Sequence, residues 1–178
     1  FHGGVYIQYD RADALRYASW AVESPSTTKY IHLNLFCDVS WGAQYDSGGI
    51  AVVFLNWLPT YGSEKATRQL YQSAWPIYPL HGSGVGELLA VSECLHTASR
   101  ELERHADSPT LAGKTVVVRI FNDNRNNLEF LQGTRSVSAS FYTTAAPVLR
   151  SILQQSKSLH HHGVDVRLEL HWIPGHHN

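Results

Sequence analysis

The sequence has little of what marks disulfide-rich, zinc-binding or membrane proteins. Its 178 residues include two cysteines, Cys37 and Cys94, which lack the paired spacing of a zinc site. One falls in an expected strand and the other in an expected helix, which favours buried thiols over a disulfide. No apolar run is long enough to span a bilayer, so no membrane partner is expected. These features favour an intracellular protein, nuclear or cytoplasmic.

Methionine is absent, and charged residues make up only 16% of the chain. Lys and Arg total 14 against 15 Asp and Glu, which gives a net charge of −1. The chain as a whole therefore does not attract nucleic acid, and binding of nucleic acid would need a local basic patch. The hydrophobic content of 43% fits one globular domain with a sizeable core. Because Phe1 is no initiator, the chain is expected to be part of a longer protein with further domains or subunits.

Hydrophobic periodicity divides the chain into strands and helices. Residues 1–30 are expected to be a lead-in helix and linker, and residues 31–178 the domain proper. The pattern predicts strands at 31–38, 50–57, within 67–75, at 115–121 and at 164–172, and helices at 12–22, 87–105, 124–132 and 142–162. This order predicts an α/β fold in which helices cover a mixed sheet.

Three acidic residues stand beside apolar sequence: Asp38 at the end of a strand, Glu87 at the start of a helix, and Asp123 directly after the most apolar strand. A carboxylate beside apolar sequence costs folding free energy unless a partner residue or a metal ion compensates its charge. Taken singly, Glu87 could be a carboxylate that favours a helix start and Asp123 a helix cap, whereas Asp38 has no helix to cap. Taken together, they suggest one cation site for Mg²⁺ or Mn²⁺.

Four short motifs in this order resemble type 1 ribonuclease H, in the form found in fungal proteins and non-LTR retroelements. They are Cys37-Asp38-Val39-Ser40, Gly86-Glu87-Leu88-Leu89-Ala90, Ile120-Phe121-Asn122-Asp123-Asn124 and His171-Trp172-Ile173-Pro174-Gly175-His176. The resemblance implies a ribonuclease H-like fold, with a five-stranded mixed sheet built from an antiparallel meander plus two parallel strands. It also implies hydrolysis of the RNA strand of RNA/DNA hybrids with two Mg²⁺ ions.

The same resemblance assigns roles to individual residues. Asp38, Glu87 and Asp123 match the first three metal-binding carboxylates of the family and are expected to be catalytic, and His176 matches its histidine for proton transfer or product release. The expected contacts to nucleic acid are Ser40, Trp41, Gln44, Asn122, Asn124 and Asn126, with Arg125 for phosphate.

The chain also departs from the family pattern. The fourth carboxylate of the family lies in a last helix downstream of the Pro-Gly-His turn, and the domain is expected to stop short of that helix. The alternatives are therefore a weakly active or inactive ribonuclease H-like module that binds or scaffolds within a larger assembly, and another nuclease or transposase of the same superfamily.

Overall fold

The computed structural model describes residues 1–24, 26–42, 44, 47–58, 69–161 and 163–175. Within these residues the chain forms a six-stranded sheet with the order β1-β6-β5-β2-β3-β4. The strands are β1 (Gly4–Tyr6), β2 (Tyr30–Gly42), β3 (Ser47–Leu55), β4 (Leu70–Ile77), β5 (Thr115–Asn122) and β6 (Asp165–Trp172). The α-helices are α1 (Arg11–Glu23), α2 (Ser83–His105), α3 (Arg125–Gln132) and α4 (Ala139–Ser158). Two short 3₁₀ helices, Pro109–Leu111 and Leu159–His161, complete the elements.

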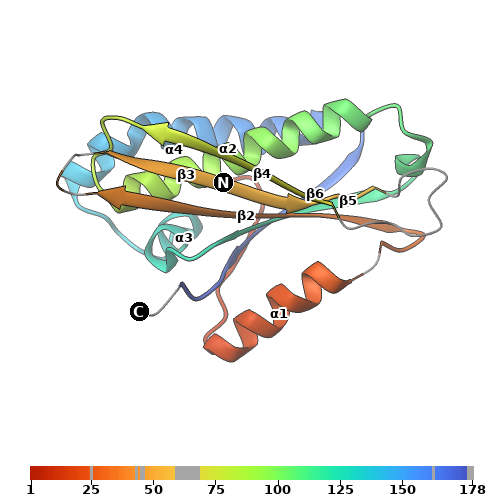
Figure 1. The fold of residues 1–178 in the computed structure, drawn as a ribbon, viewed down its shortest axis with the longest axis horizontal. Coiled ribbons are helices and arrows are strands. Elements are labelled where there is room, and N and C mark those ends of the chain that lie inside the picture. The colour runs from red at the N-terminus through yellow and green to blue at the C-terminus, as the bar shows by residue number, and fades with distance from the viewer. Residues whose placement is uncertain (25, 43, 45–46, 59–68, 162, 176–178) are drawn as a thin grey trace.

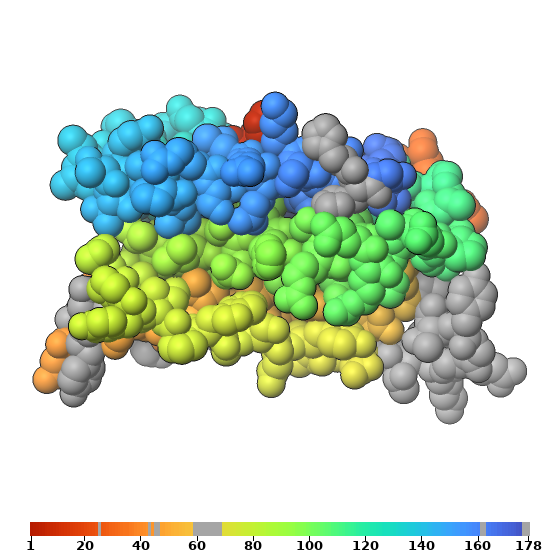
Figure 2. Space-filling view, turned by 90° about the horizontal axis from the view of Figure 1, so that it is seen from above, coloured from red at the N-terminus to blue at the C-terminus, as the bar shows by residue number. Residues whose placement is uncertain are grey.

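The expected α/β architecture is confirmed. Strands β2, β3 and β4 form the antiparallel meander, and β5 and β6 run parallel to β2. Helices α2 and α4 cover one face of the sheet and α1 lies on the other (Figure 1). Seen from above, α4 and α2 form adjacent bands, with β4 along the edge (Figure 2). The element order and strand directions are those that the resemblance implies.

The main core lies between the sheet and the helices α2 and α4. Strand β2 alternates strictly, so that Ile31, Leu33, Leu35 and Cys37 are buried on the α2 side. Strand β5 is buried along nearly its whole length, as a central strand covered on both faces should be. The two cysteines are free and buried, as predicted. None of the helices in the described part of the chain combines the length and apolarity that a membrane crossing needs.

The sheet has one strand more than the five expected. Gly4–Tyr6 pairs in parallel with Glu169–His171 at the edge of the sheet. This strand has only three residues, which is too short for an alternating pattern to be recognised in the sequence.

Two element boundaries also differ from the prediction. Strand β2 runs on to Gly42, beyond the predicted end at residue 38. Helix α2 begins at Ser83, so Glu87 is its fifth residue and not its first. Glycines at positions 84 and 86 discourage a helix prediction there, because glycine costs about 1 kcal/mol in a helix relative to alanine. The sequence also predicts a turn at residues 59–63, which lie outside the described residues.

Candidate metal centre

Asp38, Glu87 and Asp123 converge at the carboxyl end of the central strands. One carboxylate oxygen from each lies within 4.8 Å of the others. Two of the acids come together because β2 and β5 are parallel neighbours in which Phe36 pairs with Phe121, and each acid lies two positions beyond its member of that pair. Helix α2 crosses the sheet and supplies the third acid from its second turn. The predicted convergence is therefore present in the structure.

A glycine allows α2 to approach β2 this closely. A Cβ atom on Gly86 would lie 2.8 Å from Val39 Cγ2 and 3.2 Å from Leu80 Cδ2, distances that real Cβ contacts do not tolerate without a shift. The absence of a side chain at Gly86 therefore brings Glu87 down onto the strand end that carries Asp38. The amide of Val39 donates to Asp38 Oδ1 over 2.8 Å and fixes the orientation of that carboxylate.

Asn122 orients the buried carboxylate. Its Nδ2 donates to Glu87 Oε2 over 2.7 Å, and its Oδ1 accepts from the amide of Asn124 over 3.0 Å. The Asn122 side chain is completely buried, so the structure places it behind Glu87 and away from the surface.

The environment of Glu87 disfavours its charge. Burial raises the pKa of Glu87 to about 8, and the negative charges of Asp123 and Asp38 add to this rise against the hydrogen bond from Asn122. A divalent cation between the three acids would remove the mutual repulsion and replace the proton. Carboxylate oxygens are the donors that Mg²⁺ and Mn²⁺ prefer, so the residues present fit such an ion.

The segment after β6 closes over Asp123. The indole Nε1 of Trp172 donates to the backbone oxygen of Asp123 over 3.0 Å, and the amide of Ile173 donates to that of Asn122 over 3.1 Å. Gly175 then lies against the carboxylate itself, since a Cβ atom there would come within 2.3 Å of Asp123 Oδ2. His176, which was predicted to act in catalysis, lies outside the described residues.

The expected nucleic-acid contacts on the β2 side are exposed. Ser40 and Trp41 belong to the end of β2 beyond Asp38, and Gln44 follows them. Trp41 is 42% exposed, which is high for an indole in a strand. These side chains are therefore open to solvent.

The expected contacts on the α3 side differ in accessibility. Arg125 and Asn126 are exposed, whereas Asn124 caps α3 by accepting from the amide of Asn127 over 3.1 Å. The Arg125 guanidinium lies 5.7 Å from the Trp172 ring centroid and donates to Glu129 over 2.8 Å.

Asn127 was not singled out from the sequence. It is buried, and its Nδ2 donates to the carbonyl oxygen of Gly84 over 2.7 Å, which ties α3 to the start of α2. No sequence signal separates Asn127 from its neighbours Asn124 and Asn126, because the bond depends on how the two helices meet.

The fold has similar counterparts among solved structures. No protein-family model matches the chain, and no curated protein matches it. Among solved structures, the chain is similar to the N-terminal RNase H domain of Rv2228c from Mycobacterium tuberculosis, solved as a fusion with maltose-binding protein. The match has 16% sequence identity and a TM-score of 0.47, and it covers 81% of this chain and 83% of that one.

Proposed function

We propose that the protein is a type 1 ribonuclease H that hydrolyses the RNA strand of RNA/DNA hybrids with Mg²⁺, for which Mn²⁺ can substitute. The observation that carries the proposal is the convergence of Asp38, Glu87 and Asp123 within 4.8 Å. The order of the four motifs, in the form found in fungal and non-LTR retroelement domains, supports the same assignment.

The three acids have distinct parts in this proposal. Asp38 is exposed and faces an incoming strand, Asp123 is half-buried, and Glu87 closes the site from beneath. Two bound Mg²⁺ ions would activate a water molecule and stabilise the leaving oxygen of an in-line displacement. The protein itself has to supply the negative charge of the carboxylates and hold them in a fixed geometry. No covalent intermediate between enzyme and substrate is required. His176 is proposed to assist proton transfer or product release.

The proposed substrate contacts flank the acids on both sides. Ser40, Trp41 and Gln44 lie on the β2 side, and Asn124, Arg125 and Asn126 at the start of α3. Polar groups there can sense the ribose 2′-hydroxyl, which distinguishes RNA from DNA, and the exposed Arg125 can meet a phosphate. Asn122 is proposed to act through Glu87, which it holds by a hydrogen bond.

The proposal extends to the setting of the domain. Residues 31–178 would be a ribonuclease H domain within a longer protein, preceded by the segment 1–30. Its two free, buried thiols suit a reducing compartment, nuclear or cytoplasmic.

A second candidate is a ribonuclease H-like module that binds or scaffolds without efficient cleavage. Within the described residues the acidic group has three members, whereas the family resemblance implies four. The net charge of −1 also gives little general attraction for nucleic acid.

Cleavage of a hybrid with labelled RNA, in Mg²⁺, separates the two candidates. The Asp123→Asn variant should cut at least about 100-fold more slowly, because removing even a group that only hydrogen-bonds to a metal ligand lowers metal affinity or activity roughly 10–100-fold. Asp107→Asn is the matched control, since that exposed acid lies near the amino ends of β5 and β6. Binding of the hybrid without cleavage by the unmodified chain would favour the scaffold, and cleavage that survives Asp123→Asn would contradict the proposed site.

A further inference from the structure

Helix α1 packs closely on the sheet beside the candidate site. Three alanines, Ala14, Ala18 and Ala21, form its buried face. Ala18 and Ala21 build an apolar cluster with Phe121, against which Ile173 packs. This cluster therefore includes a residue two positions before Asp123 and a residue of the segment that closes over it. Small side chains on α1 let the helix lie close to both.

Polar and aromatic contacts fix α1 in this position. The Nδ2 of Asn34 on β2 donates to the carbonyl oxygen of Ala21 over 2.7 Å. The ring of Tyr17 stacks on His171 of β6 with the ring centroids 4.7 Å apart, and Arg119 of β5 lies 5.4 Å from the Trp20 ring centroid. Helix α1 is thus attached to the three strands that lead into the site.

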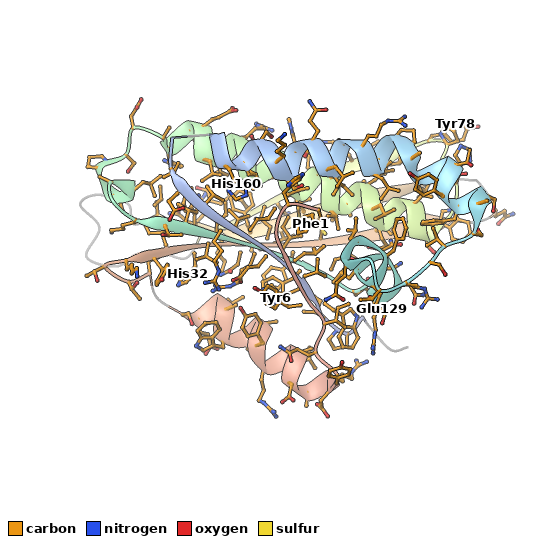
Figure 3. The ribbon with its side chains drawn as sticks, turned by 180° about the vertical axis from the view of Figure 1, so that it is seen from behind. Phe1, Tyr6, His32, Tyr78, Glu129 and His160 are labelled. Atoms are coloured by element: carbon orange, nitrogen blue, oxygen red, sulfur yellow. The ribbon has the colours of Figure 1, made fainter. Side chains whose placement is uncertain are left out.

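Figure 3 shows the molecule from behind, with Tyr6 and His32 on the side of the sheet that α1 covers. The Tyr6 ring also stacks on His171, with the two ring centroids 4.8 Å apart. Strand β1 and helix α1 therefore enclose the end of β6 together.

The first residue of α1 reaches the site. Asp10 caps the helix by accepting from the amides of Ala12 and Asp13, which fixes where the helix begins. Arg11 then donates from Nη2 to the carbonyl oxygen of Gly175 over 3.2 Å. Gly175 is the residue whose backbone lies directly against the Asp123 carboxylate.

We propose that Arg11 is a positioning residue for the metal centre: it holds the Ile173–Gly175 segment against Asp123, and so fixes the carboxylate for the cation. The inference rests on the proposed function, because it concerns the same site. It adds to that function a residue from the segment 1–30, which lies outside the family resemblance.

A purely electrostatic role for Arg11 would have the opposite consequence. A guanidinium near a cation site repels the cation, so its removal should tighten cation binding. Loss of a positioning contact should weaken cation binding, because Asp123 is then less well oriented. The sign of the change therefore distinguishes the two roles.

The test is Mn²⁺ binding to the whole 178-residue chain, followed by electron paramagnetic resonance of the free ion. Arg11→Ala should raise the dissociation constant by roughly tenfold, the lower end for lost partners of metal ligands. Arg11→Lys keeps a donor and the charge, and should recover most of the loss. Arg16→Ala is the control, because Arg16 carries the same charge on the same helix and pairs with Asp13.

Gly175→Ala tests the second half of the contact. A methyl group there has to displace the Asp123 carboxylate, so Mn²⁺ binding should weaken with Arg11 intact. Melting temperatures of the Arg11 variants should stay within about 3 °C of the unmodified chain, because only an exposed bond is lost.

The inference is overturned if Arg11→Ala binds Mn²⁺ as tightly as the unmodified chain or more tightly, whatever Gly175→Ala does. It is also overturned if the unmodified chain binds no Mn²⁺ through Asp38, Glu87 and Asp123. The measurement uses no nucleic acid. A chain that binds Mn²⁺ in an Arg11-dependent way but never cuts a hybrid would refute the nuclease proposal and leave this inference standing.

Discussion

Glu87 is the buried acid of the candidate site. It is 6% exposed and lies next to two other acids, and burial together with their charges raises its pKa to about 8. Glu87 is the fifth residue of α2, which is too far into the helix for the helix dipole to stabilise its negative charge. In the absence of a cation, the folded protein therefore keeps a proton on Glu87 at neutral pH.

Replacing this acid by its neutral analogue should stabilise the metal-free protein. The folded pKa of Glu87 is raised from 4.5, so the folded state binds more protons than the unfolded state up to about pH 8, and stability falls by up to about 1.4 kcal/mol for each pH unit in that window. Glu87→Gln should thus gain a few kcal/mol at pH 8 and little at pH 4.5. Urea unfolding with a chelator at the two pH values measures this.

Glu129→Gln is the control for that experiment. Glu129 lies on α3 and pairs with Arg125 and Arg135 at the surface, so its removal should leave the unfolding free energy nearly unchanged at both pH values. An equal gain for Glu87→Gln at pH 4.5 and pH 8 would contradict the explanation by burial and neighbouring charge.

Among the elements, β5 and β6 are joined by buried charges on the face that α1 covers, where Arg119 also contacts the Trp20 ring. Arg119 and Glu169 lie on neighbouring strands with their side chains 2.9 Å apart, and His171 contacts Glu169 over 3.1 Å. Burial opposes the charge of Glu169, but hydrogen bonds from His171 and Arg167 and the charge of Arg119 outweigh it and lower the pKa of Glu169 to about 2. Burial lowers the pKa of His171 in spite of its acidic partner.

Removing the charge of Glu169 from the Arg119–Glu169–His171 group should weaken the packing of α1 on the sheet. Glu169→Gln leaves Arg119, which is 4% exposed, without a charged partner, and the unfolding free energy should fall by about 3–5 kcal/mol. Hydrogen exchange of the α1 amides should quicken in the same variant. Unchanged stability and unchanged exchange would mean that the charges are dispensable to the docking of α1.

Sequence patterns predicted the elements whose signals are local. Strands β2 and β6 were recognised because their side chains alternate, and β5 because it is apolar throughout. Strand β1 was missed because it is short and takes its place from β6, far along the chain. The start of α2 was missed because its glycines argue against a helix, and close packing on β2 makes them necessary.

The acids of the candidate site could be predicted from the sequence, but Arg11 could not. Asp38, Glu87 and Asp123 stand out because charge is costly beside apolar sequence, and the resemblance groups them. Arg11 could not be found in this way, since an exposed arginine in a helix is ordinary until the helix is docked.

At the scale of the whole molecule, Glu87 and Glu169 give opposite pH dependences. The folded pKa of Glu169 is lowered, so its contribution is present above 4.5 and is lost as the pH falls towards 2. The stability cost of Glu87 grows as the pH rises from 4.5 to about 8. The metal-free protein should therefore be most stable near pH 5, as far as these two groups decide it.

Magnesium should move that maximum towards higher pH. The cation replaces the proton of Glu87, and at a concentration of 100 times the dissociation constant it adds about 2.7 kcal/mol. Melting temperatures between pH 3 and pH 9, with chelator and with Mg²⁺, give the two profiles. Profiles that coincide would show that Mg²⁺ does not bind the folded state at this site.

The pairing of β1 with β6 has a consequence for the nascent chain. Strand β1 and helix α1 are synthesised before β6, and so are Asp38, Glu87 and Asp123. Until then the three acids lack Trp172 and Gly175, which complete the surroundings of Asp123. The proposed metal centre therefore becomes complete only when β6 and the residues after it have been synthesised.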